Sequence, residues 1–327
     1  MMEPQALQHV LATLRTILQD SDRFSGTVDV DLDAGSFSAS LSSERFTSLQ
    51  PAPSGRTVAL DGSSIRALDG LSFVVSVSRA AAVTADEDMV RDTHVSGMRA
   101  TALSRDTCEE VFLDAYRELS DTSPPAVPDT VEEAAGALRG LQEQALARDM
   151  VGQLDVGDLC LLDGALHGNR WLQPVVDATC RLAAECDVHL ASVSKRSDLA
   201  ARGIPLLYWV QRHGDRVMPG QRWQYPLSEE RRIFVAKLHP AARHVFRIDV
   251  NPYDGEPGEV LPRLASLSDD VATLGYPYPL AAVHRAVVVT ADEASYWQRR
   301  LREQAFHEGF SRDDWEGLFY DYHAYLG

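Results

Sequence analysis

Several features that would assign a protein class are missing from this 327-residue chain. No apolar run approaches the roughly 18 residues that a membrane-spanning helix requires. The opening residues, MMEPQALQHV, lack the basic and then apolar pattern of a secretory leader. The four cysteines include no CxxC pair, so neither a disulfide framework nor a zinc site is indicated. Together these absences favour a cytoplasmic protein with reduced thiols.

Nucleotide-binding and strongly basic sequences are also missing. The chain contains no GxxxxGK[ST] motif, so it has no P-loop, and any ATP-driven step must come from a partner. The net charge of −17 argues against a protein that coats nucleic acid with its whole surface. A nuclease is still compatible with this charge, because a carboxylate metal site is itself acidic and one arginine-lined groove can bind phosphates locally.

Lysine is the scarcest charged residue. Only Lys195 and Lys237 occur among the 31 basic residues, and all the others are arginine. Where a lysine remains in such a chain, it can mark a position that needs a compact ammonium rather than a planar guanidinium. Both lysines are therefore candidate phosphate contacts, with chance retention as the alternative.

Two stretches of the chain share one pattern: residues 57–64 read TVALDGSS and residues 159–166 read LCLLDGAL. Each is a short apolar run that ends in Asp-Gly, which predicts a buried strand followed by a turn. An acid at the end of a buried strand is held rigidly at the edge of the sheet. On neighbouring strands, Asp61 and Asp163 would form a divalent-metal site. For either copy alone, the alternative is a simple turn.

The remaining pattern predicts a mixed α/β fold. Alternation over residues 26–41 indicates a hairpin, with Asp29, Asp31 and Asp33 on a solvated face. Helices are expected at residues 4–19, 105–119, 130–150, 171–186, 258–273 and within 274–289, and strands at 71–77, 94–101, 189–194, 233–238 and 244–250. Strands, then a helix, then strands with acids at their ends is the layout of an RNase H-like sheet flanked by helices.

The chain divides into three expected parts. Residues 1–54 form an N-terminal extension of a helix and a hairpin, and residues 55–290 form the core. Residues 291–327 form a helical C-terminal extension that is rich in Trp, Tyr and Phe, which is typical of a contact surface. Together with the amphipathic helix at residues 4–19, this extension is a candidate partner surface.

A site for a pair of metal ions requires further carboxylates from distant parts of the chain. The helix before the second Asp-Gly strand offers Glu132, Glu133 and Glu143. Glu143 lies nearest to the apolar seam of this helix, so its side chain is the one most able to reach inward. The alternative is an ordinary exposed glutamate on a helix.

Several motifs, in this order, resemble the NurA family of nucleases over about residues 55–290. They are VALDGSS (58–64), RGLQE (139–143), LCLLDGAL (159–166), SVSKRS (192–197), FVAKLH (234–239) and LGYPYPLAAVH (274–284). The resemblance implies an RNase H-like (PIWI-like) fold and a metal site formed by Asp61, Glu143, Asp163 and His284, with Tyr276 nearby. It also implies DNA contacts by Lys195, Arg196 and Lys237, with Lys195 near the scissile phosphate. RGLQE departs from the family pattern at its glycine and glutamine, so Glu143 carries over with less support.

The activity that the resemblance implies is 5′-to-3′ exonuclease on single- and double-stranded DNA, with endonuclease activity on single strands. Two Mn²⁺ or Mg²⁺ ions would be required. Family members resemble homodimers that dock on a HerA-type hexameric ATPase in DNA end resection and recombinational repair. The same residues leave open a catalytically weak scaffold that couples the ATPase to DNA.

Two other classes fit the residues poorly. A phosphotransferase of the haloacid dehalogenase type needs an aspartate two positions before Asp61, where this chain has Ala59. An actin-like or sugar-kinase ATPase needs Asp-x-Gly, whereas Gly62 follows Asp61 directly.

Overall fold

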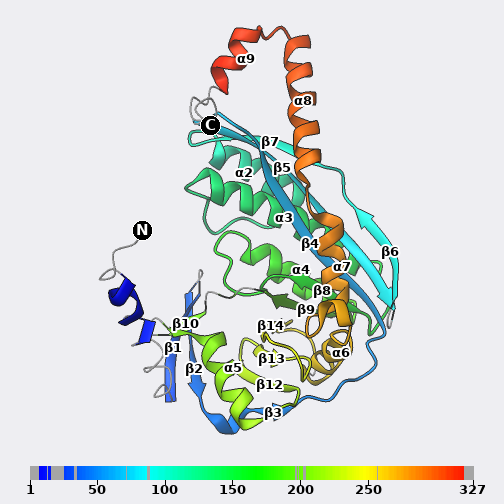
Figure 1. Ribbon diagram of the computed structural model, residues 1–327. Coiled ribbons are helices and arrows are strands. Elements are labelled where there is room, and N and C mark those ends of the chain that lie inside the picture. The colour runs from blue at the N-terminus through cyan, green and yellow to red at the C-terminus, as the bar shows by residue number, and fades with distance from the viewer. Residues whose placement is uncertain are drawn as a thin grey trace.

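The computed structural model describes residues 7–12, 14–15, 26–32, 35–70, 72–86, 89–195, 197, 199–201, 204–255 and 257–319. A ten-stranded mixed sheet forms its centre, and a smaller four-stranded sheet lies beside it (Figure 1). Within the described ranges, no helix combines the length and the apolar character needed to cross a bilayer.

The large sheet contains the predicted mixture of antiparallel and parallel strands. Its order is β3 (Thr47–Ser48), β12 (Trp223–Ser228), β13 (Ile233–Lys237), β14 (Phe246–Val250), β9 (His189–Ser194), β8 (Leu159–Asp163), β4 (Arg56–Asp69), β5 (Phe73–Asp86) and β6 (Met89–Val95), with β7 (Arg99–Ser104) also paired to β5. Strands β4, β8 and β9 are parallel to one another, and their outer neighbours are antiparallel. An antiparallel meander followed by a helical crossover to parallel strands is the expected RNase H-like arrangement.

Helices cover both faces of this sheet (Figure 1). One face packs on α2 (Cys108–Leu119), α3 (Val131–Val151) and α4 (Gln173–Glu185), and the other packs on α6 (Val260–Ser266) and α7 (Tyr278–Val287). Because side chains alternate along a strand, Val58 and Leu60 of β4 enter the first core and Ala59 enters the second. The neighbouring strand β8 alternates in the same way, so β4 and β8 are both buried on both faces.

The small sheet confirms the predicted hairpin. Its order is β11 (Ile204–Pro205), β10 (Ala200–Ala201), β1 (Gly26–Leu32) and β2 (Gly35–Leu41), and α5 (Leu206–Val217) packs with it in a third core. Asp29 and Asp31 are exposed, as a solvated face requires, and Asp33 lies outside the described residues. Residues 7–12, 14 and 15 are helical, and the apolar Leu7 and Leu11 are exposed.

The first Asp-Gly turn was expected at Asp61, and this expectation is wrong. Strand β4 continues past Asp61 and stays paired with β5 as far as Asp69 opposite Val74. Long-range pairing with β5 overrides the local turn signal of Asp-Gly. The second Asp-Gly behaves as predicted, because β8 ends at Asp163 and Gly164 leaves the strand with a φ of +133°, which favours glycine.

A difference also occurs toward the C-terminus. The helix expected at 258–273 is interrupted, because α6 ends at Ser266 and Asp270 caps a separate 3₁₀ turn, Val271–Thr273. Residues 291–319 form two helices, α8 (Ala291–His307) and α9 (Arg312–Leu318), in agreement with the helical C-terminal extension that was expected. Figure 1 shows α8 projecting beyond α7, with α9 folded back from its far end.

Candidate metal centre

The strand register places Asp61 and Asp163 side by side. Strands β4 and β8 are parallel, with Leu60 opposite Leu162, so the next residue on each strand is an aspartate. Residues Ala59 and Leu161, two positions earlier, both face the core beneath α7. By the alternation of side chains along a strand, the two carboxylates also point to the α7 side.

Helix α7 adds an imidazole to this pair. The Nδ1 atom of His284 lies 2.7 Å from Oδ2 of Asp61. One ligand atom from each of Asp61, Asp163 and His284 lies within 4.8 Å of the others. Asp61 is buried and its Oδ1 accepts the Gly62 N–H at 2.8 Å, whereas the His284 side chain is 53% exposed. The cluster is thus rigid on the strand side and open on the imidazole side.

Glu143 approaches from α3, on the opposite face of the sheet. Its Oε2 lies 3.0 Å from where a Cβ on Gly62 would be, and 3.6 Å from the Arg139 guanidinium. Burial raises the pKa of Glu143 to about 8, opposed by Arg139 and increased further by Asp61 and Asp163. Glu143 is not one of the residues whose ligand atoms lie within 4.8 Å of one another. It lies next to that cluster, on the α3 side of Gly62.

The other two glutamates of α3 serve structural purposes. Glu133 forms a capping box with Thr130, the N-cap of α3. Glu132 forms an ion pair with Arg66 at 2.6 Å on the exposed surface.

Lys195 and Tyr276 border the same cluster. The Lys195 ammonium, just after β9, donates to Oδ2 of Asp163 and lies 5.3 Å from the centroid of the Tyr276 ring. Burial raises the pKa of Asp163, while the Lys195 hydrogen bond lowers it. Burial, reinforced by Asp163 and Asp61, also raises the pKa of Tyr276, so its phenol stays neutral. The Tyr276 hydroxyl faces Asp163 without completing a hydrogen bond of normal geometry.

The other predicted DNA contacts are not brought to this cluster. Lys237 is buried at the end of β13, and its ammonium pairs with Asp215 of α5 at 2.6 Å. This placement gives no support to a role in binding DNA. Arg196 lies outside the described residues.

The residues that are present suit a hard divalent cation. Carboxylate oxygens and one imidazole nitrogen are ligands that Mn²⁺ and Mg²⁺ accept, with the nitrogen favouring Mn²⁺. Buried carboxylates repel one another, and a bound cation would relieve that repulsion. The raised pKa of Glu143, caused by burial and increased by Asp61 and Asp163, and the Lys195 ammonium that donates to Asp163 are consistent with a pocket that favours positive charge.

Sequence reasoning missed residues that position the site. Arg139 donates to the Gly62 carbonyl at 3.1 Å, and its spacing of four from Glu143 in RGLQE was an available signal. Asp249 of β14 is fully buried and accepts the N–H groups of Leu166 and His167, in the loop after Asp163. It is paired with Arg247, and two charges in an apolar strand are a signal for a buried ion pair.

Comparison with known proteins places the fold. Scans against models of protein families and against curated proteins gave no match. The crystal structure of the NurA nuclease from Sulfolobus solfataricus is similar, with a TM-score of 0.59, 15% identity, and coverage of 95% of this chain and 99% of that chain. A second NurA crystal structure gives a TM-score of 0.52 and 10% identity over 81% of this chain and 91% of that chain. The chain therefore has the NurA nuclease fold, as its motifs predict.

Proposed function

We propose that this protein is a divalent-metal-dependent DNA nuclease of the NurA family. The observation that carries the proposal is the meeting of Asp61, Asp163 and His284, from β4, β8 and α7, on a NurA-like fold. These residues are far apart in sequence, and no requirement of packing explains a buried carboxylate (Asp61) beside a partly buried one (Asp163). Such a cluster costs free energy unless a cation is bound there.

The metal ligands in this proposal are Asp61, Asp163, His284 and Glu143. Bound Mn²⁺ or Mg²⁺, as a pair, would supply activation of water and stabilisation of the leaving oxygen in phosphodiester hydrolysis. The protein's own groups hold the geometry: the Gly62 amide fixes the Asp61 carboxylate. Glu143 takes part by losing its proton, which the positive charge of a cation favours.

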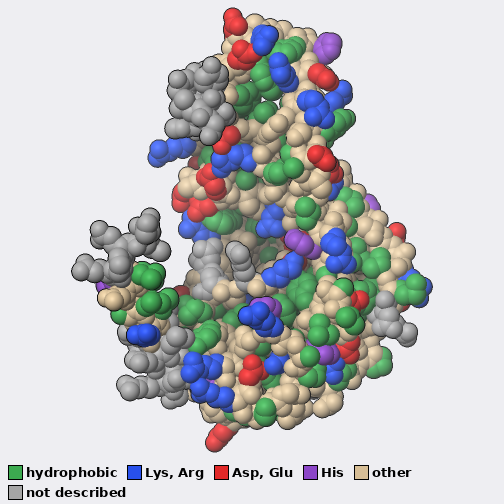
Figure 2. Space-filling model, in the orientation of Figure 1, with side chains coloured by type: hydrophobic (Ala, Val, Ile, Leu, Met, Phe, Trp, Pro, Cys, Tyr) green, Lys and Arg blue, Asp and Glu red, His purple; other side chains and the backbone are tan. Residues whose placement is uncertain are grey.

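Lys195 and Tyr276 act on the substrate side of the cluster. The Lys195 side chain is 37% exposed, so its ammonium can meet a phosphate while it remains beside Asp163. Tyr276 is neutral, and its buried hydroxyl faces Asp163, so it borders the carboxylate that would hold the cation. Figure 2 shows Lys and Arg side chains across the middle of one face, so basic groups are available despite the net charge of −17.

The finer functional assignment follows from the motifs. We propose 5′-to-3′ exonuclease and single-strand endonuclease activity for a cytoplasmic homodimer that acts with a HerA-type hexameric ATPase in end resection and recombinational repair. The absence of a P-loop from the sequence supports a separate source of ATP-driven translocation. Residues 55–290 would form the nuclease core, and residues 1–54 and 291–327 would form extensions for partner contacts.

The experiment that tests the activity is a cleavage assay on a 5′-labelled duplex with Mn²⁺. Wild-type protein should degrade the duplex, and Asp61→Asn should lose at least about 10–100-fold in rate, since changing even the supporting partner of a metal ligand costs that much. Asp29→Asn is the control, because Asp29 is an exposed aspartate of β1. Unchanged degradation by Asp61→Asn would reject the site. DNA binding without cleavage by the wild type would instead favour the scaffold role.

A further inference from the structure

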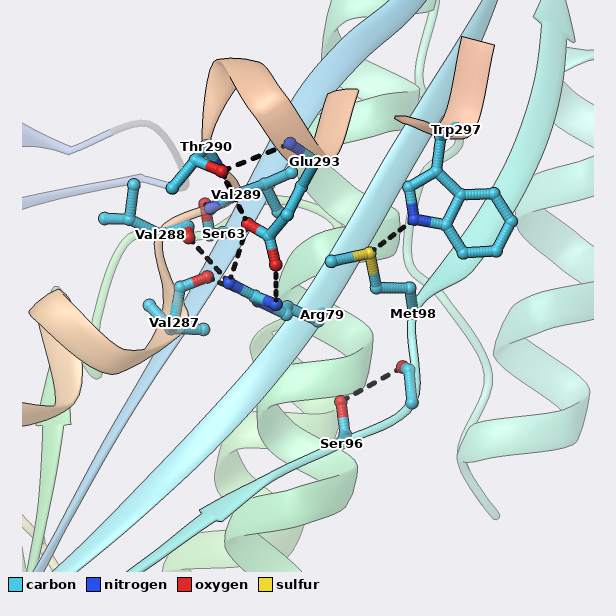
Figure 3. A network of polar contacts seen from close by, with 11 residues as sticks. Ser63, Arg79, Ser96, Met98, Val287, Val288, Val289, Thr290, Glu293 and Trp297 are labelled. Atoms are coloured by element: carbon cyan, nitrogen blue, oxygen red, sulfur yellow. Dashed lines mark hydrogen bonds and ion pairs between the residues drawn. The ribbon is translucent and has the colours of Figure 1, made fainter. Parts of the chain in front are cut away.

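The end of α7 is held by one arginine of the sheet (Figure 3). Arg79 of β5 lies opposite Ser63 of β4, and its guanidinium donates to the carbonyls of Val287 at 2.8 Å and Val288 at 2.6 Å. The last carbonyls of a helix have no partner within the helix. A cation at this end satisfies them and interacts favourably with the helix dipole. Arg79 is therefore the C-terminal cap of α7.

The same guanidinium also holds the start of α8. It bonds the two carboxylate oxygens of Glu293 at 2.8 and 3.3 Å. Glu293 in turn forms a capping box with Thr290 at the first turn of α8 (Figure 3). Hydrogen bonds from Thr290 lower the pKa of Glu293, burial raises it, and Arg79 lowers it. The pKa is below its usual value, so the carboxylate is charged. The Arg79 side chain is only 12% exposed, and all three of its nitrogens are engaged.

This junction lies next to the candidate metal centre. The Val288 N–H donates to the His284 carbonyl at 3.3 Å, so His284 is in the turn of α7 that Arg79 caps. The Val289 N–H donates to Oγ of Ser63 at 3.2 Å, and Ser63 is the second residue after Asp61 on β4. The helix end that carries the imidazole is thus fixed to the two strands beside the carboxylate.

We propose that Arg79 is a positioning residue that holds the His284 imidazole against Asp61 by capping α7. This role rests on the proposed function, because it matters only if His284 is a metal ligand. Arg79 does not touch the cluster itself; it acts through the α7 backbone. Without it, the last turn of α7 frays and the imidazole loses its fixed distance from the carboxylates.

Removal of Arg79 should leave the fold in place, because α8 has separate contacts. The Trp297 indole donates to Sδ of Met98 at 2.8 Å, and the Gln298 amide donates to the Ala67 carbonyl (Figure 3 shows the Trp297 contact). The α7 side chains Leu280 and Val283 remain in the core. The expected change is therefore local to the junction.

The first test is Mn²⁺ affinity, measured by calorimetry on the full chain. Arg79→Met should bind Mn²⁺ about tenfold more weakly than wild type, which is the usual cost of losing support for a metal ligand. Arg79→Lys keeps the charge but not the forked contact, so its affinity should fall between the two. Arg99→Met is the matched control, because it removes another pair between an arginine of the sheet and a helix glutamate, Arg99 of β7 with Glu118 of α2, and should bind as wild type does.

The second test needs no metal. Amide hydrogen exchange at Val288 and Val289 should be faster in Arg79→Met than in wild type, while exchange in α3 stays unchanged. Wild-type Mn²⁺ affinity in Arg79→Met would overturn the role of Arg79 and leave the proposed function intact. A wild-type protein that binds no Mn²⁺ would overturn both. Faster exchange throughout α3 would show a general structural role and also overturn the proposal.

Discussion

The imidazole of His284 lies 2.7 Å from the carboxylate of Asp61, although 223 positions separate the two residues in the chain. The carboxylate comes from an early strand and the imidazole from a late helix. They meet because the alternation of β4 turns Asp61 toward the face on which α7 packs. This contact, with Asp163 beside it, is what makes the cluster a candidate site.

Gly62→Ala should damage the site without unfolding the protein. The new Cβ would lie 3.0 Å from Oε2 of Glu143 and 3.1 Å from Cγ of Arg139, so both side chains must move. Overpacking of this kind costs about 1–3 kcal/mol. We expect weaker Mn²⁺ binding together with a lower melting temperature, measured by calorimetry.

Gly136→Ala is the matched control for Gly62→Ala. Gly136 lies on α3, the helix of Glu143, and nothing is within 4 Å of its added Cβ. It should raise stability by about 0.5–1 kcal/mol, as alanine does in a helix interior, and leave Mn²⁺ binding unchanged. Equal effects of the two substitutions on Mn²⁺ binding would contradict the contact between Gly62 and Glu143.

Glu143 should make the stability of the metal-free protein depend on pH. Its pKa is about 8 in the folded protein and 4.5 in the unfolded chain, so the folded state holds the proton more tightly. The resulting stability is complete below pH 4.5 and is lost as the pH rises through about 8. The free energy of unfolding should fall by up to about 1.4 kcal/mol per pH unit in that window, measured by urea unfolding in EDTA.

Glu143→Gln should flatten this pH profile, because glutamine has no proton to lose. In the wild type, Mn²⁺ must displace the Glu143 proton. The affinity for Mn²⁺ should therefore rise with pH up to about 8, and binding should release a proton. Parallel unfolding profiles for the wild type and Glu143→Gln would contradict the raised pKa.

The two lysines should give opposite results when each is replaced by methionine. Lys195→Met removes the ammonium at Asp163, so DNA cleavage should slow by about 10²-fold, while Mn²⁺ binding is not weakened. Lys237→Met breaks a pair in which the lysine is buried and Asp215 is partly exposed, so it should lower the melting temperature and spare the cleavage rate per folded molecule. A cleavage rate that depends on Lys237 and not on Lys195 would reverse the assignment.

Deletion of residues 310–327 should separate partner binding from cleavage. No residue of α9 is buried, and its end is held by a ring contact of Phe319 with Phe73, with centroids 5.4 Å apart. The shortened protein should fold and cleave short single strands with Mn²⁺, yet bind a HerA-type ring more weakly in a co-elution assay. A loss of helical circular dichroism larger than that of the deleted segment would place these residues in the core.

The elements that the sequence predicts best have local causes. Thr130 and Glu133 cap α3 through neighbouring atoms, and the apolar run at residues 189–194 forms β9 as expected. The same kind of local signal, Thr290 with Glu293, begins α8. The course of β4 past Asp61 depends on β5, which no local pattern reveals.

The candidate site divides in the same way. The apolar runs before Asp61 and Asp163 predict strand acids, whereas the imidazole was assigned only through the family resemblance. The contact of Glu143 with Gly62 depends on the packing of α3 against the sheet. Arg79 lies in a strand, and no local sequence pattern predicts its contact with the end of α7. Contacts between distant elements are the part that a single sequence does not specify.

The place of α7 in the chain has a consequence for biosynthesis. Every strand of the large sheet precedes α7, so the ribosome releases the residues that carry Asp61 and Asp163 long before those that carry His284. A nascent or prematurely terminated chain would have the acids without the imidazole. Under the proposed function, the metal centre would be complete only after translation has passed α7 and that helix has docked.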